Sequence, residues 1–287
     1  MEKLLLNALA AAIRAGMATL AVYRSDFSVT QKLDDSPLTL ADRRSHDIIE
    51  AALKPLGVPI LSEEGRDIAY AERKTWGTFW LVDPLDGTKE FIKRNDEFTV
   101  NIALIQNQVP VMGVIFAPVL GIAYFAEKTI GAFKLDDPVL VNRIGSAEPG
   151  SLAPKLSEVM AGSKRLPLSE PTENPYTIVG SRSHATPELE VFVAAKRREF
   201  HSVNFIPAGS SLKFCLVAEG RAAIYPRLGP TMEWDTGAGQ AIAICAGASV
   251  VEHDSGKSLV YNKDSLLNPW FVVAMSVRRT SSEDFRS

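Results

Sequence analysis

Two carboxylates three residues apart, Asp83 and Asp86, stand at the end of an apolar run. Residues 79–82 are uncharged and rich in strand-forming side chains, so they predict a buried strand that stops at Asp83. The proline and glycine of Pro84-Leu85-Asp86-Gly87 then predict a turn. Thr88 would open the next element with free N–H groups, which favour a phosphate. The pattern fits phosphate chemistry, and it fits an ordinary solvated turn equally well.

Three more acidic positions have a similar character. The pair Glu63-Glu64 ends a short predicted strand over 58–61, and Asp235 opens a predicted helix that is rich in small residues. Asp42 lies on the inner face of a predicted helix over 39–53, where an acid needs a partner. Each position also has an ordinary explanation, namely a polar turn for the glutamates, N-capping for Asp235 and the helix dipole for Asp42.

These acids predict a cation site if the fold brings Glu63, Asp83, Asp86 and Asp235 into one pocket. At about 4 Å, each pair of like charges costs on the order of 4 kcal/mol at an effective dielectric constant of about 20. Cations must therefore occupy such a pocket. The ligands are all oxygens, without a histidine or cysteine cluster, which favours a hard ion, Mg²⁺ before Zn²⁺.

The elements that must position these residues fall into two groups. An apolar stripe over 4–22 predicts a first helix, and Thr39 is expected to cap the second. Alternation of residue types predicts an antiparallel meander over 98–104, 111–116, 122–126 and 132–135. Later in the chain strands and helices alternate, which favours a layered α/β arrangement: strands over 176–179, 203–206, 222–225, 249–251 and 271–274, and helices over 187–198, 210–219 and 235–246.

Between these groups, residues 136–175 are rich in Pro, Gly, Ser and Glu and contain one short helical piece near 156–160. We expect a long loop here, and with it the boundary between two lobes. The predicted organisation is an α+β lobe over 1–145 with the metal site, a connecting loop over 146–175, and an α/β lobe over 176–287 with substrate contacts.

The composition is that of an ordinary globular protein, with 287 residues, 46% of them hydrophobic, and a formal net charge of −3. This charge gives no electrostatic reason to expect nucleic-acid binding. Cys215 and Cys245 lie among apolar neighbours, which favours buried free thiols in a reducing compartment. Asn7 and Arg14 interrupt the apolar segment 4–22, so we expect a core helix and no integral membrane segment, with a signal peptide as the alternative.

Several of these segments together resemble the lithium-sensitive, magnesium-dependent phosphatases of the superfamily that includes inositol monophosphatase and fructose-1,6-bisphosphatase. The resemblance rests on 83–88, on the earlier Glu63-Glu64 pair and on Trp234-Asp235. Other segments are similar to the 3'(2'),5'-bisphosphate nucleotidases of CysQ type within that superfamily, namely 88–95, 181–184, 209–220 and 225–227. The resemblance implies the sugar phosphatase fold, an αβαβα sandwich in which layers of helices alternate with sheets. Its fold class is a layered α+β or α/β arrangement.

The resemblance also implies roles for individual residues. Two or three Mg²⁺ ions are expected on the side chains of Glu63, Asp83, Asp86 and Asp235 and on the backbone carbonyl of Leu85. Asp42 and Thr88 match the catalytic pair that orients and deprotonates the attacking water. The expected substrate contacts are Glu63, Leu85, Asp86, Gly87, Thr88, Ser181, His184, Ser210, Lys213, Arg227 and Asp235.

The function implied is a phosphomonoesterase that converts adenosine 3',5'-bisphosphate, and as a further substrate its sulfated form, to the 5'-monophosphate nucleotide, clearing a by-product of sulfate assimilation. An inositol or sugar monophosphatase on the same scaffold is the alternative, and a non-catalytic regulator that binds nucleotide and magnesium is a remote one. We expect a cytoplasmic monomer or homodimer whose partner is the small-molecule nucleotide. Peripheral association with the inner face of the membrane is the alternative for its location.

Overall fold

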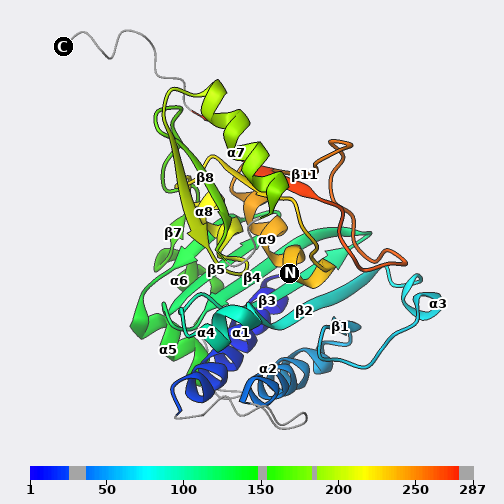
Figure 1. Cartoon of the computed structure of the whole chain (residues 1–287). Coiled ribbons are helices and arrows are strands. Elements are labelled where there is room, and N and C mark those ends of the chain that lie inside the picture. Colours follow the sequence, from blue (N-terminus) through cyan, green and yellow to red (C-terminus); the bar gives the residue numbers. More distant parts are fainter. Residues whose placement is uncertain (26–36, 148–153, 183–185, 278–287) are drawn as a thin grey trace.

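The layers of the molecule follow one another as helices, sheet, helices, sheet and helix (Figure 1). The computed structural model describes residues 1–25, 37–147, 154–182 and 186–277, and for 37–39 the backbone only. Helices α1 (Glu2–Tyr23) and α2 (Pro37–Leu53) pack on the first sheet, and α8 (Leu212–Ala218) and α9 (Glu233–Cys245) lie between the two sheets. Helix α7 (Pro187–Glu199) packs on the second sheet. The αβαβα sandwich is confirmed.

Helix α1 is a core helix, as predicted. By length and composition it could cross a membrane, but 56% of its most apolar 18-residue stretch is buried inside the protein. Leu5, Leu9 and Ile13 are fully buried against the sheet. Helix α2 begins at Pro37, so the prediction that Thr39 caps it is wrong. Proline suits a first helical position because its missing N–H has no helical acceptor there.

The first sheet has seven strands in sequence order, and all neighbours are antiparallel except the parallel pair β1–β2. The predicted meander is confirmed. Apolar side chains cover both faces, one in a cluster with α1 and the other in a cluster with α8 and α9. The strands are β1 (Ile60–Ser62), β2 (Thr78–Asp86), β3 (Thr99–Gln106), β4 (Val109–Ala117), β5 (Ile122–Glu127), β6 (Gly131–Leu135) and β7 (Lys164–Arg165).

Strand β2 does not stop at Asp83 as predicted but continues to Asp86. Asp83 pairs with Asn101, and Asp86 pairs with Thr99. Between these two pairs β2 contains one residue more than β3, which is a β-bulge. Residues three apart in a regular strand point to opposite faces, and the extra residue of this bulge brings both carboxylates to the same face. Pro84 fits there because a bulge does not require its missing N–H.

The segment over 136–175 is not the predicted long loop, although the short helix predicted near 156–160 is confirmed. It holds α5 (Pro138–Ser146), α6 (Leu156–Ala161) and β7, and β7 extends the first sheet by pairing with β6. Asp137 caps α5 by accepting the N–H groups of Val139 and Leu140. The division into lobes over 1–145 and 176–287, with 146–175 between them, stays a prediction.

The second sheet has the order β11-β12-β10-β8-β9, and the predicted alternation of strands and helices is confirmed. Gly113 on β4 and Gly239 on α9 allow α9 to approach its neighbours closely, because a Cβ at Gly239 would lie 2.4 Å from the ring of Phe214. Cys215 is buried and Cys245 half-buried, and both are free thiols. The strands are β8 (Tyr176–Ser181), β9 (Val203–Ala208), β10 (Ile224–Arg227), β11 (Ser249–Glu252) and β12 (Phe271–Ala274).

Candidate metal centre and substrate pocket

Three carboxylates from three distant segments meet at one end of a pocket. Glu63, Asp83 and Asp235 each offer an oxygen, and these oxygens lie within 4.8 Å of one another. Glu63 follows β1, where its N–H donates to the carbonyl of Val82 at 3.1 Å and prolongs the parallel pairing with β2. Asp83 stands at the start of the bulge, and Asp235 lies in the first turn of α9.

Asp86 lies beside this cluster and is held differently. Its Oδ2 accepts hydrogen bonds from Ser211 Oγ at 2.7 Å and from Asn101 Nδ2 at 3.3 Å. The same hydroxyl lies 2.9 Å from the carbonyl of Asp235, so it stands between Asp86 and Asp235. The charge of Asp86 is among the causes that raise the pKa of each carboxyl of the cluster.

Burial and mutual repulsion raise the pKa of each carboxyl in the cluster. Asp83 is 1% exposed, and burial, followed by the charges of Asp86 and Glu63, raises its pKa well above the usual value. Burial and then Asp86 raise the pKa of Asp235 to about 7, and the same two causes raise that of Glu63 to about 7. A bound cation removes the repulsion. Three carboxylates without a nitrogen or sulfur donor fit a hard ion such as Mg²⁺.

Asp42 on α2 faces the same acids. Its pKa is raised to about 8, first by burial and then by the charges of Glu64 and Glu63. One turn later, Ser45 Oγ donates to the carbonyl of Pro84 at 2.6 Å and ties α2 to the bulge. The inward orientation predicted for Asp42 is therefore confirmed, whereas its catalytic role stays a prediction.

Thr88 begins α4 (Thr88–Lys93) and is exposed at the pocket. The residue before it, Gly87, has φ +94°, a left-handed conformation that favours glycine. A Cβ at Gly87 would also lie 3.2 Å from the carbonyl of Glu97 and from Cβ of Ser210. Glycine is thus required where the chain turns from the bulge into α4.

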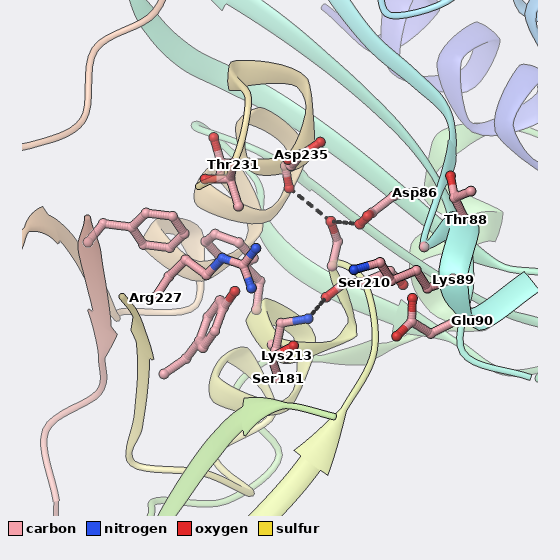
Figure 2. Close-up of a pocket in the computed structure, with 16 residues that line it drawn as sticks. Asp86, Thr88, Lys89, Glu90, Ser181, Ser210, Lys213, Arg227, Thr231 and Asp235 are labelled. Atoms are coloured by element: carbon pink, nitrogen blue, oxygen red, sulfur yellow. Dashed lines mark hydrogen bonds between the residues drawn. The ribbon is translucent and has the colours of Figure 1, made fainter. Parts of the chain in front are cut away.

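The pocket opens between the turn that follows β2 and the segments of the second sheet, of α8 and of α9 (Figure 2). The structure brings most of the predicted substrate contacts to its wall. His184 lies outside the described residues, Glu63 lies in the cluster beyond the wall, and Leu85 is buried, with its N–H donating to Asp83 Oδ1 at 3.0 Å. The predicted residues on the wall are Asp86, Gly87, Thr88, Ser181, Ser210, Lys213, Arg227 and Asp235.

Three cations line the pocket, Lys89, Lys213 and Arg227, and the last two come from α8 and β10. Lys213 is 5% exposed, and its Nζ donates to the carbonyls of Ala208 and Ser210. Burial lowers its pKa to about 8, against the opposing effect of Asp86. Arg227 donates to the carbonyl of Pro230 at 2.8 Å. An ammonium group has three N–H donors, so one donor of Lys213 is left for a ligand.

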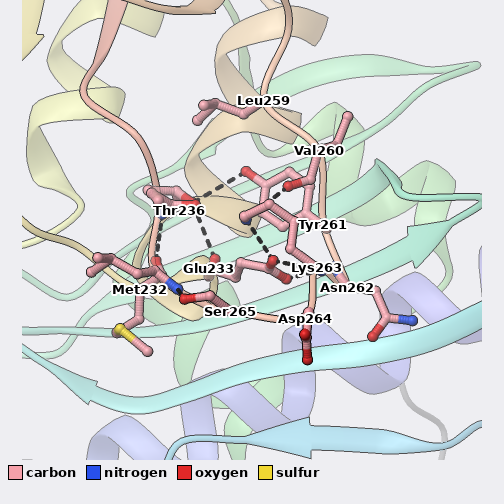
Figure 3. A network of polar contacts seen from close by, with 12 residues as sticks. Met232, Glu233, Thr236, Leu259, Val260, Tyr261, Asn262, Lys263, Asp264 and Ser265 are labelled. Carbon is pink, nitrogen blue, oxygen red and sulfur yellow. Dashed lines mark hydrogen bonds and ion pairs between the residues drawn. The ribbon is translucent and has the colours of Figure 1, made fainter. Parts of the chain in front are cut away.

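Helix α9 begins at Glu233, so Asp235 is not its N-cap as the ordinary explanation required. Met232 is the N-cap, and Asp235 Oδ2 accepts its N–H at 2.8 Å, which fixes the carboxylate at the helix start. Glu233 is fully buried and accepts the N–H groups of Asn262 at 2.6 Å and Lys263 at 3.0 Å (Figure 3). Lys263 Nζ also donates to it at 2.6 Å.

The chain segment around this glutamate also holds the start of α9 in place through hydrogen bonds. We call residues 260–268 the strap. Its Asn268 donates to the carbonyl of Met232 at 2.7 Å and to Thr236 Oγ1 at 3.1 Å. Buried Arg73 donates to Asn262 Oδ1 at 2.9 Å and holds the strap from the other side. The start of α9, and Asp235 with it, is therefore fixed by residues far along the chain.

Sequence reasoning missed Asn101, Ser211 and Glu233 as residues around the site. Asn101 alternates with apolar residues along β3, which is typical of a side chain on a solvated face, but both faces of this sheet are buried. A polar residue in a strand of apolar ones, opposite a predicted metal ligand, was the available signal. Ser211 is hidden in a predicted helix start, where serine has an ordinary capping role.

Comparison with known proteins agrees with this geometry. The model of the inositol monophosphatase family matches residues 1–280. The chain is 44% identical over 267 residues to the 3'(2'),5'-bisphosphate nucleotidase CysQ of Salmonella typhimurium, covering 91% of this chain and 95% of that protein. The CysQ of Buchnera aphidicola is 38% identical over 255 residues, covering 88% of this chain and 84% of that one.

Solved structures agree as well. The crystal structure of CysQ from Bacteroides thetaiotaomicron, a bacterial member of the inositol monophosphatase family, superposes with a TM-score of 0.89 at 47% identity, covering 97% of this chain and 99% of that chain. An inositol monophosphatase from Zymomonas mobilis, at 18% identity and a TM-score of 0.68, shares the fold and covers 93% of this chain and 90% of that one. The chain therefore belongs to the inositol monophosphatase family.

Proposed function

We propose that this protein is a magnesium-dependent phosphomonoesterase that removes the 3'-phosphate from adenosine 3',5'-bisphosphate. The observation that carries the proposal is one pocket that adjoins the acidic cluster and whose wall also carries the cations Lys213 and Arg227. A substrate with two phosphates fits such a pocket, because one phosphate can lie at the metals and the other at the cations. The relative from Salmonella typhimurium, which is 44% identical, is named a 3'(2'),5'-bisphosphate nucleotidase.

The cluster supplies the ligands. Glu63, Asp83 and Asp235, with Asp86 and the carbonyl of Leu85, would hold two or three Mg²⁺ ions. Bound magnesium would lower the pKa of a coordinated water and offset charge on the phosphate. The family is magnesium-dependent in general, whereas the number of ions is part of the proposal.

The chain's own groups would then orient the reactants. Thr88 Oγ would accept a hydrogen bond from the attacking water, and the N–H groups of Gly87 and Thr88 would bind phosphate oxygens. Asp42 would take the proton that the water loses. Its raised pKa belongs to the metal-free site, and cations bound nearby would lower that pKa so that the carboxylate can act as a base.

Location and assembly complete the proposal. We retain a cytoplasmic enzyme whose partner is a small nucleotide. The alternative of peripheral membrane association is dropped, because in the described part of the chain α1 uses its apolar surface for core packing. A monomer or homodimer stays a prediction.

The test compares two substrates, adenosine 3',5'-bisphosphate and inositol 1-phosphate, in wild type and Lys213→Ala. The variant should lower kcat/KM for the bisphosphate about 10- to 150-fold, the equivalent of roughly 1.5–3 kcal/mol for a charged hydrogen bond. Inositol 1-phosphate has no second phosphate and should be hardly affected. Lys164→Ala is the matched control, since Lys164 forms an exposed ion pair with Asp136.

Three outcomes would contradict the proposal. A wild type that prefers inositol 1-phosphate, or a Lys213→Ala variant that loses equally on both substrates, would favour the inositol or sugar monophosphatase. Absence of phosphate release from either substrate with magnesium would favour the non-catalytic regulator.

A further inference from the structure

Two buried side chains outside the acid cluster hold a single oxygen of Asp86. Asn101 on β3 is 1% exposed and Ser211 at the start of α8 is 2% exposed, so neither side chain is available to solvent. Both side chains donate a hydrogen bond to Asp86 Oδ2. Ser211 Oγ lies 2.7 Å from this oxygen, and Asn101 Nδ2 lies 3.3 Å from it. They also contact each other, with Nδ2 and Oγ 2.9 Å apart.

The direction of these hydrogen bonds is fixed by their surroundings. Thr99 Oγ1 donates to Asn101 Oδ1 at 3.0 Å, so the amide oxygen faces Thr99 and the amide N–H groups face Asp86 and Ser211. Ser211 has one hydroxyl proton and two acceptors, Asp86 Oδ2 and the carbonyl of Asp235 at 2.9 Å. An ionised carboxylate is the stronger acceptor, so the proton goes to Asp86.

The bulge in β2 creates this arrangement. It brings Asp86 to the face of the sheet that Asn101 and Thr99 share, and that face meets the N-terminal end of α8. Helix α8 also carries Lys213, one of the cations that line the pocket. Asp86 is thus fixed from the first sheet by Asn101 and from the start of α8 by Ser211.

We propose that Asn101 and Ser211 are positioning residues that hold Asp86 Oδ2 so that the carboxylate presents its other oxygen, Oδ1, to a cation. This inference rests on the proposed function, because it takes Asp86 as a metal ligand. Hydrogen bonds that orient a ligating carboxylate commonly affect metal affinity as well as activity. Since Ser211 stands at the N-cap position of the helix that carries Lys213, the same contact ties this helix to the proposed metal ligand.

A purely structural role predicts something different. Buried polar groups need partners in any case, and loss of these bonds would then lower stability without changing cation affinity. Cation affinity measured without substrate therefore separates the two roles. Mn²⁺ is a suitable probe, because oxygen ligands bind it as they bind Mg²⁺ and the free ion is counted by its paramagnetic resonance signal.

The experiment titrates Mn²⁺ into metal-free wild type, Asn101→Ala, Ser211→Ala and the double variant. Each single variant should weaken Mn²⁺ binding by about 10-fold or more. The double variant should weaken it by less than the product of the two, because both residues act on one oxygen. Cys215→Ala is the matched control, since it shortens a buried side chain one turn further along α8, and should bind Mn²⁺ like wild type.

Further variants keep the outcome decisive. Ser211→Thr retains the hydroxyl, so it should bind Mn²⁺ with most of the wild-type affinity. If Asn101→Ala does not fold, the comparison of Ser211→Ala with Ser211→Thr still tests the proposal. Wild-type Mn²⁺ affinity in both single variants, with weakened binding in Asp86→Asn, would overturn this inference and leave the proposed function intact. Wild-type affinity in Asp86→Asn itself would instead refute the proposed metal site.

Discussion

Replacing Asp235 by asparagine should make the metal-free protein more stable while abolishing its stabilisation by magnesium. The pKa of Asp235 rises from 3.8 to about 7 in the folded chain, which corresponds to about 4 kcal/mol of destabilisation once the carboxyl is ionised. The asparagine still offers an oxygen to the N–H of Met232, so we expect a net gain of about 2–4 kcal/mol.

The sign follows from the protons bound in each state. Below pH 4 the carboxyl is protonated in both the folded and the unfolded chain, and it contributes nothing. Between about pH 4 and pH 7 the unfolded chain has lost its proton and the folded chain has kept it, so the free energy of unfolding falls as the pH rises. Above about pH 7 the loss is complete. Asp235→Asn removes this loss.

The assay is urea unfolding with a chelator at about pH 5 and about pH 8, repeated with magnesium at the higher pH. Wild type should lose stability between the two pH values and regain it with magnesium, because a ligand that binds only the folded state stabilises it. The variant should be the more stable protein without metal at the higher pH and should gain little from magnesium. Equal metal-free stabilities at the higher pH, or an undiminished magnesium effect in the variant, would refute the reasoning.

Two other substitutions test the neighbourhood of the cluster. Thr88→Ala should lower kcat far more than it raises KM, because the hydroxyl acts on the attacking water; Thr75→Ala, an exposed threonine that bonds its own turn, is the control in steady-state assays, and an unchanged kcat would move Thr88 from catalysis to binding. Glu233→Gln should cost about 1–3 kcal/mol in urea unfolding, because it leaves Lys263 without its buried partner, and should weaken Mn²⁺ binding through Asp235; loss of stability with unchanged Mn²⁺ affinity would limit Glu233 to a structural role.

Much of the fold could be predicted because the sequence pattern reports burial directly. The stripe of α1, the meander from β3 to β6 and the alternation after β8 all follow from apolar spacing. The path of β2 could not be predicted, since Pro84 and Gly87 are turn residues in isolation. Only the pairing of Asp86 with Thr99 on β3 shows that the strand continues. Helix α5 was missed although Asp137-Pro138 is a typical N-cap and first helical position.

For the site, sequence could locate the carboxylates but not what holds them. Glu63, Asp83 and Asp235 stand out because acids at strand ends and helix starts form a recognisable pattern. Asn101 and Ser211 could not be predicted, because their role depends on α8 packing against a sheet face that alternation alone assigns to solvent. Side-chain partners so far apart in the chain are set by tertiary packing, which local patterns do not contain.

The strap has a consequence for synthesis on the ribosome. The first sheet is complete once Arg165 has emerged, whereas the hydrogen bonds that hold the start of α9 need Asn268. At about 5–20 residues per second, the roughly 100 residues between them take on the order of 5–20 s. During that interval the sheet face that α9 later covers, with Leu81 and Ala103, is open to other nascent chains and to chaperones. A slow stretch of translation in this region would therefore lengthen the period of aggregation risk without altering the finished enzyme.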